Sequence, residues 1–270
     1  MTDLPYAELG EELMTAAASR VPIAPLTSRY PELTLEDAYR VQEHQVRAWD
    51  RAGRHLIGFK VGLTSKAMQR MLGVASPDFG HLYQDMVLDN TAPINAERFI
   101  APRVEPEVTF VLKDDLSGPG LTIIDAVRAV DYAIASIELI DSRIADWRIG
   151  LADTIADNAS SGALLLGKVP VALDAVDLGL LGCVVTKNGE VVASGAGAAV
   201  LGHPINGLLW LANQLGRFGR TLPAGSVVMS GSITAAVPVA PGDRVTAAFA
   251  GLGTVDARVA PASHDSEENS

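Results

Sequence analysis

Apolar and polar residues follow one period before about residue 90 and another after it. In residues 34–53, TLEDAYRVQEHQVRAWDRAG, apolar side chains recur every three or four positions, which predicts an amphipathic helix. Thr34 suits the N-cap, with Asp37 at the capping-box position, and Gly53 suits the end of the helix. Residues 9–20 predict a shorter helix of the same kind. The first part of the chain is therefore expected to be mainly helical.

The stretch that leads up to residue 90 is more mixed. Residues 55–65, HLIGFKVGLTS, predict a strand followed by a turn, and residues 65–73 predict a brief helix closed by Gly73. Residues 75–86 contain Pro and Gly at close spacing, so we interpret them as a loop.

Strands dominate after residue 90, and the Asn188-Gly189 pair predicts a tight hairpin between two of them. Val-rich runs divided by Gly, Pro or Asn-Gly predict strands within residues 104–112, 168–173, 182–195, 226–231 and 235–259. Helices are predicted to interrupt these strands at residues 122–140 and 204–219.

The fold class that follows is α+β. We expect a small helical N-terminal region at residues 1–90, a β-rich domain at residues 91–260 and a disordered tail at residues 261–270, where acidic and polar residues replace apolar ones.

The composition limits the classes of protein to which the chain can belong. It has 270 residues, 48% of them hydrophobic and 20% charged, which is typical of a globular protein with a substantial core. No apolar run approaches the ~20 residues that a membrane-spanning helix needs, and the N-terminus lacks both the basic and the apolar part of a secretory signal. We therefore expect a cytoplasmic protein without a membrane segment.

Charge and cysteine content exclude further classes. The formal net charge of −11, from 21 basic and 32 acidic residues, disfavours nucleic acid as a partner. The single cysteine, Cys183, excludes an internal disulfide and any multi-cysteine metal site. Its apolar neighbours favour a buried hydrophobic role over that of a nucleophile.

Two carboxylates lie at the start of an apolar strand, in RVEPEVTFVL. Glu105 and Glu107 would share one face of the strand about 6.6 Å apart, while Pro106 would point to the other face. Because proline has no N–H for the ladder, Pro106 indicates an edge or a bulge. Two ionised carboxylates at this spacing would repel by about 2 to 3 kcal/mol at an effective dielectric constant near 20. Either the pair faces solvent on an edge strand, or another group offsets the repulsion.

A third acid, Glu138, lies inside the apolar run AIASIELI. A lone ionised carboxylate is costly to bury there unless it is paired or bound to a metal. Three converging carboxylates are typical of a hard divalent cation, and the lack of flanking His or Cys favours Mg²⁺ or Mn²⁺ over Zn²⁺. The alternative is an ion pair between Glu138 and Arg143 or Arg103. The pattern of residues leaves both open.

Four long motifs occur in order along the chain: GFKVGLTSKAMQRMLGV, SPDFGHLYQDMV, PRVEPEVTFVL and IADWRIGLADTIADNASSGALLLG. They resemble the 2-hydroxypentadienoate (2-keto-4-pentenoate) hydratase group of the fumarylacetoacetate hydrolase superfamily, and the similarity extends over residues 10–259. The resemblance implies a β-rich roll of the C-terminal type of that superfamily after a helical N-terminal part, in agreement with the pattern of elements. In this group an E-x-E pair and a later Glu bind Mg²⁺ or Mn²⁺, which implies Glu105, Glu107 and Glu138 as ligands.

The resemblance also implies a reaction. The hydratases convert 2-hydroxypenta-2,4-dienoate into its 2-oxo-3-enoate tautomer and add water at C4 to give 4-hydroxy-2-oxopentanoate. A metal that chelates the carboxylate and the 2-oxygen of such a substrate stabilises the enolate, and proton transfers at C3 and C5 need acid–base groups close by. The group forms homo-oligomers and works beside a 4-hydroxy-2-oxoacid aldolase in aromatic or steroid ring degradation, so the same partners are expected here.

Lys60 and Asp78 are the candidates for acid–base chemistry. By pattern alone Lys60 is equally well a strand lysine that extends its ammonium to solvent, and Asp78 a turn residue. The resemblance places both in the active site, where burial beside a cation would favour a lowered pKa for Lys60. Ser160 and Ser161 have no neighbour that would activate a nucleophile, so their hydroxyls are expected to bind the substrate carboxylate.

Other assignments remain as alternatives. His81 and His203 are interpreted as structural, and the sequence offers no counterpart of the His–Glu pair that hydrolytic members of the superfamily use, which argues against C–C bond hydrolysis. The 4-oxalocrotonate (2-oxo-3-hexenedioate) decarboxylases share most of the motifs, and the same chelate would stabilise the enolate left by CO₂. A hydratase of a longer or dicarboxylic 2-oxo acid is a further alternative. A non-catalytic binding domain is disfavoured by the three glutamates together with Lys60 and Asp78.

Overall fold

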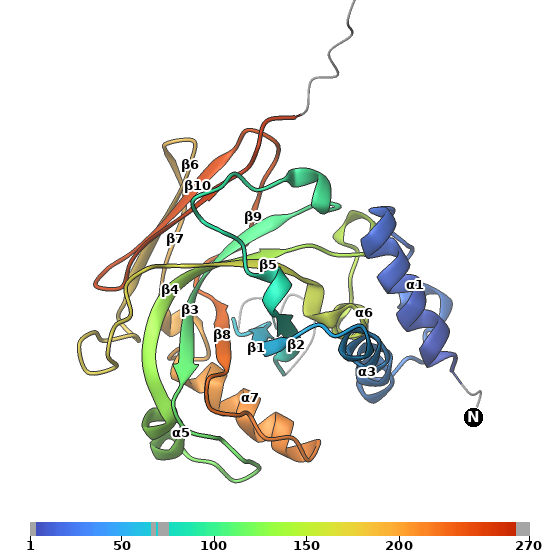
Figure 1. The fold of residues 1–270 in the computed structure, drawn as a ribbon, viewed down its shortest axis with the longest axis horizontal. Helices are drawn as coiled ribbons and strands as arrows, with labels where there is room; N and C mark the ends of the chain where they lie inside the picture. Colours follow the sequence, from blue (N-terminus) through green and yellow to red (C-terminus); the bar gives the residue numbers. More distant parts are fainter. Residues whose placement is uncertain (1–3, 66–68, 70–75, 263–270) are drawn as a thin grey trace, which may run out of the picture.

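The computed structural model describes residues 4–65, 69 and 76–262, and its larger β-sheet has seven strands. Six of them follow the order β2-β1-β8-β3-β4-β5, while the short β9 pairs with the first residues of β3 (Figure 1). The strands are β1 Leu56–Gly62, β2 Asp78–Tyr83, β3 Arg103–Leu112, β4 Val130–Ile140, β5 Ser161–Leu166, β8 Val227–Ser232 and β9 Val237–Pro238. β3 and β4 lie in the middle of this sheet, so polar residues on them are candidates for a buried site.

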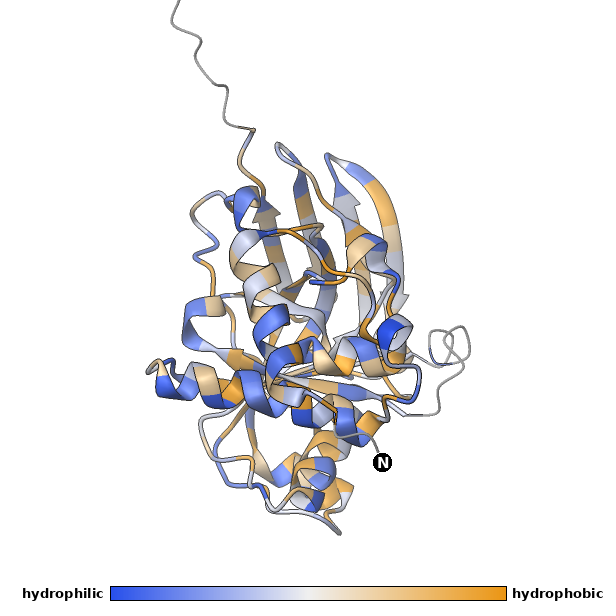
Figure 2. Cartoon of the chain, turned by 90° about the vertical axis from the view of Figure 1, so that its right-hand side faces the viewer, coloured by the Kyte–Doolittle hydropathy of each residue, from blue (hydrophilic) through white to orange (hydrophobic). Residues whose placement is uncertain are grey.

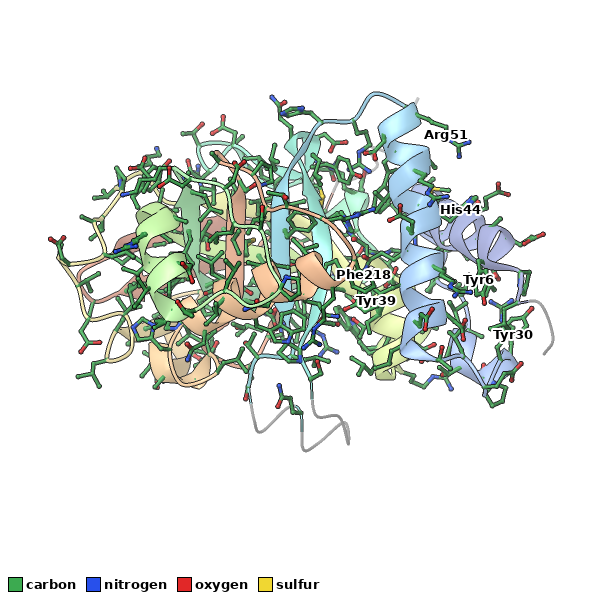
Figure 3. The ribbon with its side chains drawn as sticks, turned by 90° about the horizontal axis from the view of Figure 1, so that it is seen from below. Tyr6, Tyr30, Tyr39, His44, Arg51 and Phe218 are labelled. Atoms are coloured by element: carbon green, nitrogen blue, oxygen red, sulfur yellow. The ribbon has the colours of Figure 1, made fainter. Side chains whose placement is uncertain are left out.

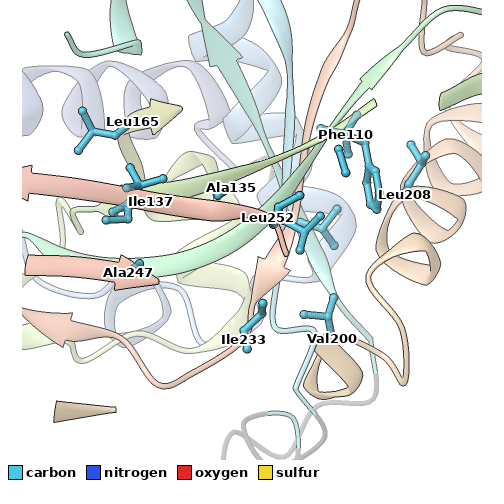
Figure 4. Packing of buried hydrophobic residues seen from close by; sticks show 14 of the residues in the cluster. Phe110, Ala135, Ile137, Leu165, Val200, Leu208, Ile233, Ala247 and Leu252 are labelled. Atoms are coloured by element: carbon cyan, nitrogen blue, oxygen red, sulfur yellow. The ribbon is translucent and has the colours of Figure 1, made fainter. Parts of the chain in front are cut away.

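A smaller antiparallel sheet packs against β4 and β5. Its order is β11-β10-β6-β7, and its strands are β6 Gly182–Lys187, β7 Glu190–Ala196, β10 Arg244–Phe249 and β11 Gly253–Arg258. The main hydrophobic core contains Ile137 and Leu165 from the large sheet and Ala247 from the small one (Figure 4). Cys183 is buried in the same core, as predicted.

Helices cover the large sheet in two groups. Near β1 and β2 lie α1 Tyr6–Ser19, α2 Leu26–Arg29, α3 Leu35–Arg51 and α6 Leu151–Ala156, which share a second hydrophobic cluster (Figure 1). At the other end α5 Ile123–Ala129 packs on α7 Ile205–Arg217, and Leu208 of α7 joins Phe110 of β3 in the main core. Short 3₁₀ helices are η1 Gln84–Met86, η2 Ala96–Arg98, η3 Ala145–Trp147, η4 Asn158–Ser160 and η5 Gly197–Ala199.

The helices carry both hydrophilic and hydrophobic residues along their length, as expected for elements with one face on a core (Figure 2). In the described part of the chain, no helix combines the length and the apolar character that crossing a membrane requires.

Two local predictions are confirmed. Thr34 caps α3 through a capping box, in which its hydroxyl accepts from the Asp37 N–H and the Asp37 carboxylate accepts from the Thr34 N–H. Asn188 and Gly189 have φ angles of 54° and 89° between β6 and β7, as a two-residue hairpin turn requires.

Three predictions of elements are wrong. Within the helix predicted for residues 122–140, only α5 is helical and most of the rest forms β4. The prediction failed because a strand that is buried on both faces has a continuous apolar sequence without alternation, which cannot be distinguished from that of a buried helix. The predicted loop at residues 75–86 contains β2, all of whose residues are buried. Residues 168–173 form no strand; Pro170 has no N–H for a ladder and Val169 is exposed. Most of the helix predicted for residues 65–73 lies outside the described residues.

The position of β1 and β2 bears on the predicted division at residue 90. Both strands precede that residue, and both are hydrogen-bonded into the large sheet. The N-terminal helical part therefore ends at Arg51 in the secondary structure. The division into folding units at residues 90 and 260 stays a prediction. The α+β class with a β-rich body is confirmed.

Candidate active site

A cavity of about 370 Å³ opens over the middle of the large sheet, between β1, β2, β3 and the segment that contains α6 and η4. Lys60, Asp78, Glu105 and Ser160 are among the residues that line it. Four of the seven site residues predicted from the sequence thus border one cavity, although they come from four separate parts of the chain.

The three glutamates converge because β3 and β4 pair in register. Glu105 lies directly opposite Glu138, and Glu107 follows Glu105 on the same face of β3. One carboxylate oxygen from each residue lies within 4.8 Å of the other two. Glu107 and Glu138 are fully buried and Glu105 is half-buried, so the predicted alternative of a solvent-facing pair on an edge strand is wrong.

Burial raises the pKa of each carboxyl group in this cluster, and the charge of neighbouring carboxylates adds to this effect. Burial raises the pKa of Glu138 to about 7, with Glu105 acting in the same direction and Lys60 opposing. Burial raises the pKa of Glu107 well above its usual value, and the charges on Glu138 and Glu105 add to this. Such a cluster is unfavourable unless a positive charge compensates it.

The donor set fits a hard divalent cation. Glu138 Oε1 has no hydrogen-bond partner among the described residues, and Oε2 has only its ion pair with Lys60. Carboxylate oxygens held a few ångströms apart, with free lone pairs, are the ligands that Mg²⁺, Mn²⁺ and Ca²⁺ prefer. These three residues could therefore hold such an ion.

A bulge in β8 places a backbone N–H where it can bind the carboxylate of Glu107. The pairing of β3 with β8 shifts by one residue between Glu107 and Thr109, with the extra residue in β8. Pro106 precedes this bulge and pairs in register with Ile137 of β4, and β3 is an interior strand and not an edge. At this bulge Gly231 has a φ of 116° and donates its N–H to Glu107 Oε2 over 2.8 Å. A Cβ atom at Gly231 would overlap with the side chain of Thr64, and residues other than glycine rarely adopt this φ. Glycine is therefore required at this position.

Lys60 provides the positive charge in contact with the cluster. Its Nζ lies 3.2 Å from Glu138 Oε2, and its side chain is fully buried. Burial alone would lower the pKa of Lys60, but the nearby carboxylates, led by Glu138 and Asp78, outweigh burial and raise it. This direction is opposite to the lowered pKa expected for Lys60 from the sequence, which assumed a neighbouring cation. The predicted alternative partners of Glu138 are wrong, because Arg143 pairs with Asp157 and Arg103 contacts Trp147.

Asp78 faces Lys60 from the neighbouring strand. It pairs in register with Gly62 at the end of β1, and its Oδ1 is buried without a hydrogen-bond partner in the described part of the chain. Burial raises the pKa of Asp78 more than Lys60 and the Thr154 hydroxyl lower it. A carboxyl group with a raised pKa at the wall of a cavity is a candidate for proton transfer to and from a bound molecule.

The structure separates the two predicted serines. Ser160 lines the cavity, and its hydroxyl is 3.3 Å from that of Thr154. Ser161 instead borders a different cavity of about 200 Å³, together with Arg143. The turn that presents Ser160 has three successive residues with positive φ, Asn158, Ala159 and Ser160, at 52°, 52° and 54°. Since such angles cost free energy in residues other than glycine, this turn is held by its surroundings.

Asn158 is one of the groups that hold the turn. Its side-chain amide accepts from the N–H of His81 and donates to the carbonyl of His81, both on β2. His81 itself does not line the active-site cavity; its ring faces Arg220 over 3.1 Å, in a third cavity lined also by Tyr39 and Phe218. The rings of Tyr39 and Phe218 lie close together (Figure 3). His203 accepts from the N–H of Ile205 at the start of α7. Both histidines lie outside the candidate site, as expected.

The cavity wall also contains residues that the sequence analysis did not assign to the site, among them Arg103, Trp147 and Thr154. Arg103 could have been found, because it lies two residues before Glu105 and therefore on the same face of the strand. Trp147 and Thr154 belong to irregular or short elements, and no spacing rule places them at the cavity.

Known proteins resemble this chain over most of its length. The family model of the fumarylacetoacetate (FAA) hydrolase C-terminal domain matches residues 60–260. The chain is 43% identical over 257 residues to a 2-hydroxyhexa-2,4-dienoate hydratase of Comamonas testosteroni, covering 94% of this chain and 97% of the relative. It is 41% identical over 255 residues to a 2-keto-4-pentenoate hydratase of Paraburkholderia xenovorans, covering 94% and 95% of the two chains.

A solved structure is similar over the same length. The 4-oxalocrotonate decarboxylase from Pseudomonas putida G7, complexed with magnesium and adipate, superposes with a TM-score of 0.91 at 41% identity and covers 94% of this chain and 97% of its own. The resemblance inferred from the motifs is thus confirmed by the family model, by curated relatives and by a solved fold. The chain belongs to the fumarylacetoacetate hydrolase family.

Proposed function

We propose that this chain is a metal-dependent hydratase of 2-hydroxypenta-2,4-dienoate. It would act through the 2-oxo-3-enoate tautomer and give 4-hydroxy-2-oxopentanoate. The observation that carries the proposal is the cluster of Glu105, Glu107 and Glu138, which contacts Lys60 through Glu138 and reaches the cavity through Glu105, beside Lys60 and Asp78. The hydratase names of relatives at 41% and 43% identity support the same reaction.

Glu105, Glu107 and Glu138 would hold Mg²⁺ or Mn²⁺, and Gly231 would orient Glu107 through its N–H. When bound, the ion acts as a Lewis acid on the carboxylate and 2-oxygen of the substrate. Binding of a divalent ion by the Pseudomonas putida decarboxylase supports this assignment.

Asp78 and Lys60 are the residues that we assign to proton transfer and to the charge changes that accompany it. Tautomerisation removes the proton from the 2-hydroxyl group and adds one at C5; hydration then adds hydroxide at C4 and a proton at C3. Asp78, with its raised pKa, is suited to give and take the carbon-bound protons. Lys60 keeps the buried carboxylates compensated and offers an ammonium to the substrate oxygens. Of the two serines, Ser160 is the one we assign to the substrate carboxylate, because it borders the cavity.

Decarboxylation of 2-oxohex-3-enedioate is the second candidate. It is favoured by the solved decarboxylase at 41% identity and needs the same enolate stabilisation. Purified protein with Mg²⁺ or Mn²⁺ should be given both acids, with product identification and CO₂ measurement. Consumption of the dienoate without CO₂ release is the expected result. Release of CO₂ from the diacid with no consumption of the dienoate would overturn the hydratase assignment.

Three further expectations complete the proposal. We expect a homo-oligomer, a cytoplasmic location and a role before a 4-hydroxy-2-oxoacid aldolase, since the product is the substrate of such an enzyme. Aromatic or steroid ring degradation is the metabolic setting in which this sequence of reactions is useful.

A further inference from the structure

Arg143 is a buried arginine that follows the end of β4 and borders the smaller cavity beside Ser161. Every nitrogen of its guanidinium donates a hydrogen bond within the protein. The backbone N–H and Nε bind the two carboxylate oxygens of Asp157, and Nη2 binds the carbonyl of Asp157. Nη1 binds the carbonyl of Ser161 over 2.9 Å and also that of Asp141. One side chain thus fixes the backbone at three places, which only the planar fork of a guanidinium allows.

These hydrogen bonds lie on both sides of the turn that presents Ser160. Asp157 precedes and Ser161 follows the three residues with positive φ, so one guanidinium connects the two ends of the turn. Ser160 donates its N–H to the carbonyl of Asp157, and its own carbonyl accepts from the N–H of Asp141, each over 2.9 Å. Because three successive left-handed residues without glycine cost free energy, the turn needs contacts from outside to persist. Arg143 provides them.

Arg143 also ties this turn to the strand that carries a residue of the carboxylate cluster. It lies directly after β4, on which Glu138 faces Glu105. On the other side, the amide of Asn158 ties the turn to β2. The position of the Ser160 hydroxyl relative to the carboxylate cluster therefore depends on Arg143.

We propose that Arg143 is a positioning residue for substrate binding. It holds Ser160 Oγ where this hydroxyl group can bind the carboxylate of a 2-oxo acid that is chelated at the cluster, and it does not contact the substrate itself. A shift of about 1 Å in a group that positions the substrate can cost about 10²-fold in rate, so the contacts of Arg143 matter for the reaction. The inference rests on the proposed function, from which it takes the role of Ser160.

The test is a double-mutant cycle on ligand binding. 2-Oxopentanoate has the chelating 2-oxo acid group but no double bond to hydrate, and its Kd in the presence of Mg²⁺ is measured by titration calorimetry. Ser160→Ala should weaken binding by about tenfold, as expected for the loss of a hydrogen bond to a charged group. Arg143→Lys keeps the charge beside Asp157, but one nitrogen cannot hold both ends of the turn, so binding should again weaken by up to about tenfold. The double variant should bind at most about twofold more weakly than Ser160→Ala, because Arg143 acts through Ser160.

Further measurements separate positioning from a general loss of structure. The affinity for Mg²⁺ without 2-oxopentanoate should be unchanged in Arg143→Lys, because the glutamates of the cluster lie on β3 and β4 and not on the turn. Arg244→Lys alters an arginine–aspartate pair in the small sheet and should leave both affinities unchanged. If Arg143→Lys does not fold, Asp157→Asn replaces it in the cycle, since an amide keeps the shape of the side chain and weakens its pairing with Arg143.

The outcomes distinguish this inference from the proposed function. Additive losses in the cycle, an unchanged affinity in Ser160→Ala or an equal loss of Mg²⁺ affinity in Arg143→Lys would overturn the inference alone. Failure of both Arg143→Lys and Asp157→Asn to fold would overturn it as well, because Arg143 would then serve the stability of the whole chain. A non-additive cycle in a protein that does not consume the dienoate would support the inference and count against the hydratase reaction. Failure of the unaltered protein to bind 2-oxopentanoate with Mg²⁺ would overturn both.

Discussion

Glu105 and Glu138 are direct cross-strand partners in the pairing of β3 with β4, so two carboxylates face each other in the interior of the large sheet. Like charges in this position destabilise a sheet. The pairing is tolerable where Lys60 and a bound cation supply positive charge, and this relationship is the basis of the first two predictions.

Removing one ligand should abolish turnover but not folding. In Glu107→Gln the amide keeps the shape of the side chain, and it removes one of three charges that repel each other. We expect Mg²⁺-dependent turnover to fall by about 100-fold or more, since even groups that only support a ligand cost 10- to 100-fold. Thermal unfolding with and without Mg²⁺ gives the second readout, because the ion should raise the Tm of the unaltered protein but not that of the variant. The exposed Glu190→Gln is the matched control. An unchanged rate in Glu107→Gln would contradict the assignment of Glu107 as a metal ligand.

Lys60 and Glu138 should be strongly coupled in the metal-free protein. Lys60→Met leaves the buried Glu138 without its partner and should lower the free energy of unfolding by about 3 to 5 kcal/mol. Adding Glu138→Gln should recover much of this loss, which denaturant titration of the two single variants and the double variant would measure. Lys168→Met, at an exposed position, is the control. Additive losses in the double variant would contradict the coupling.

Displacing Asp78 should separate proton transfer from metal binding. A methyl group at Gly62 would overlap with Asp78 Oδ1, so Gly62→Ala should force this carboxyl group away from its position. We expect kcat to fall by about 10²-fold, in line with the contribution of one acid–base group, while the affinity for Mg²⁺ changes little. Gly182→Ala, where an added Cβ meets nothing within 4 Å, is the control. Parallel losses of metal affinity and kcat would show that Asp78 has no separate role.

His81 should make the protein sensitive to acid. Burial lowers the pKa of His81 to about 3, and the Arg220 guanidinium acts in the same direction. In the unfolded chain a histidine has a pKa of about 6.5, so between these values the unfolded state binds more protons and the free energy of unfolding falls as the pH falls. Replacing His81 by Gln should remove up to about 1.4 kcal/mol per pH unit from this slope.

The measurement for His81 is denaturant unfolding at several pH values from 7 down to 4.5. The stability difference between His81→Gln and the unaltered protein should shift in favour of the variant as the pH decreases. His55→Gln changes an exposed histidine and should leave the slope as it is. Parallel pH profiles for the His81 variant and the unaltered protein would refute the neutral buried state.

The sequence predicted the elements of the fold less well than it predicted which polar residues come together in the structure. The E-x-E pair was found because strand alternation is a property of neighbouring residues. The position of Glu138 opposite Glu105 could not be derived, because β4 has too little alternation to be distinguished from a helix and register depends on contacts distant in sequence. β2 was missed for a related reason: it is short, fully buried and contains Gly80, which suggested a loop. The position of Trp147 depends on positive φ angles in a turn, and such a turn has no periodic sequence pattern from which the position could be predicted.

The amide of Asn158 has a consequence beyond the turn that contains it. β2 is one of the two outer strands in the order of the large sheet, and outer strands can expose N–H and C=O groups that pair with another polypeptide. Asn158 occupies both groups of His81, and Gln42 donates to the carbonyl of Phe79. Two side-chain amides thus occupy backbone groups that an added strand would need, and one of them, Asn158, belongs to the turn that presents Ser160 to the cavity.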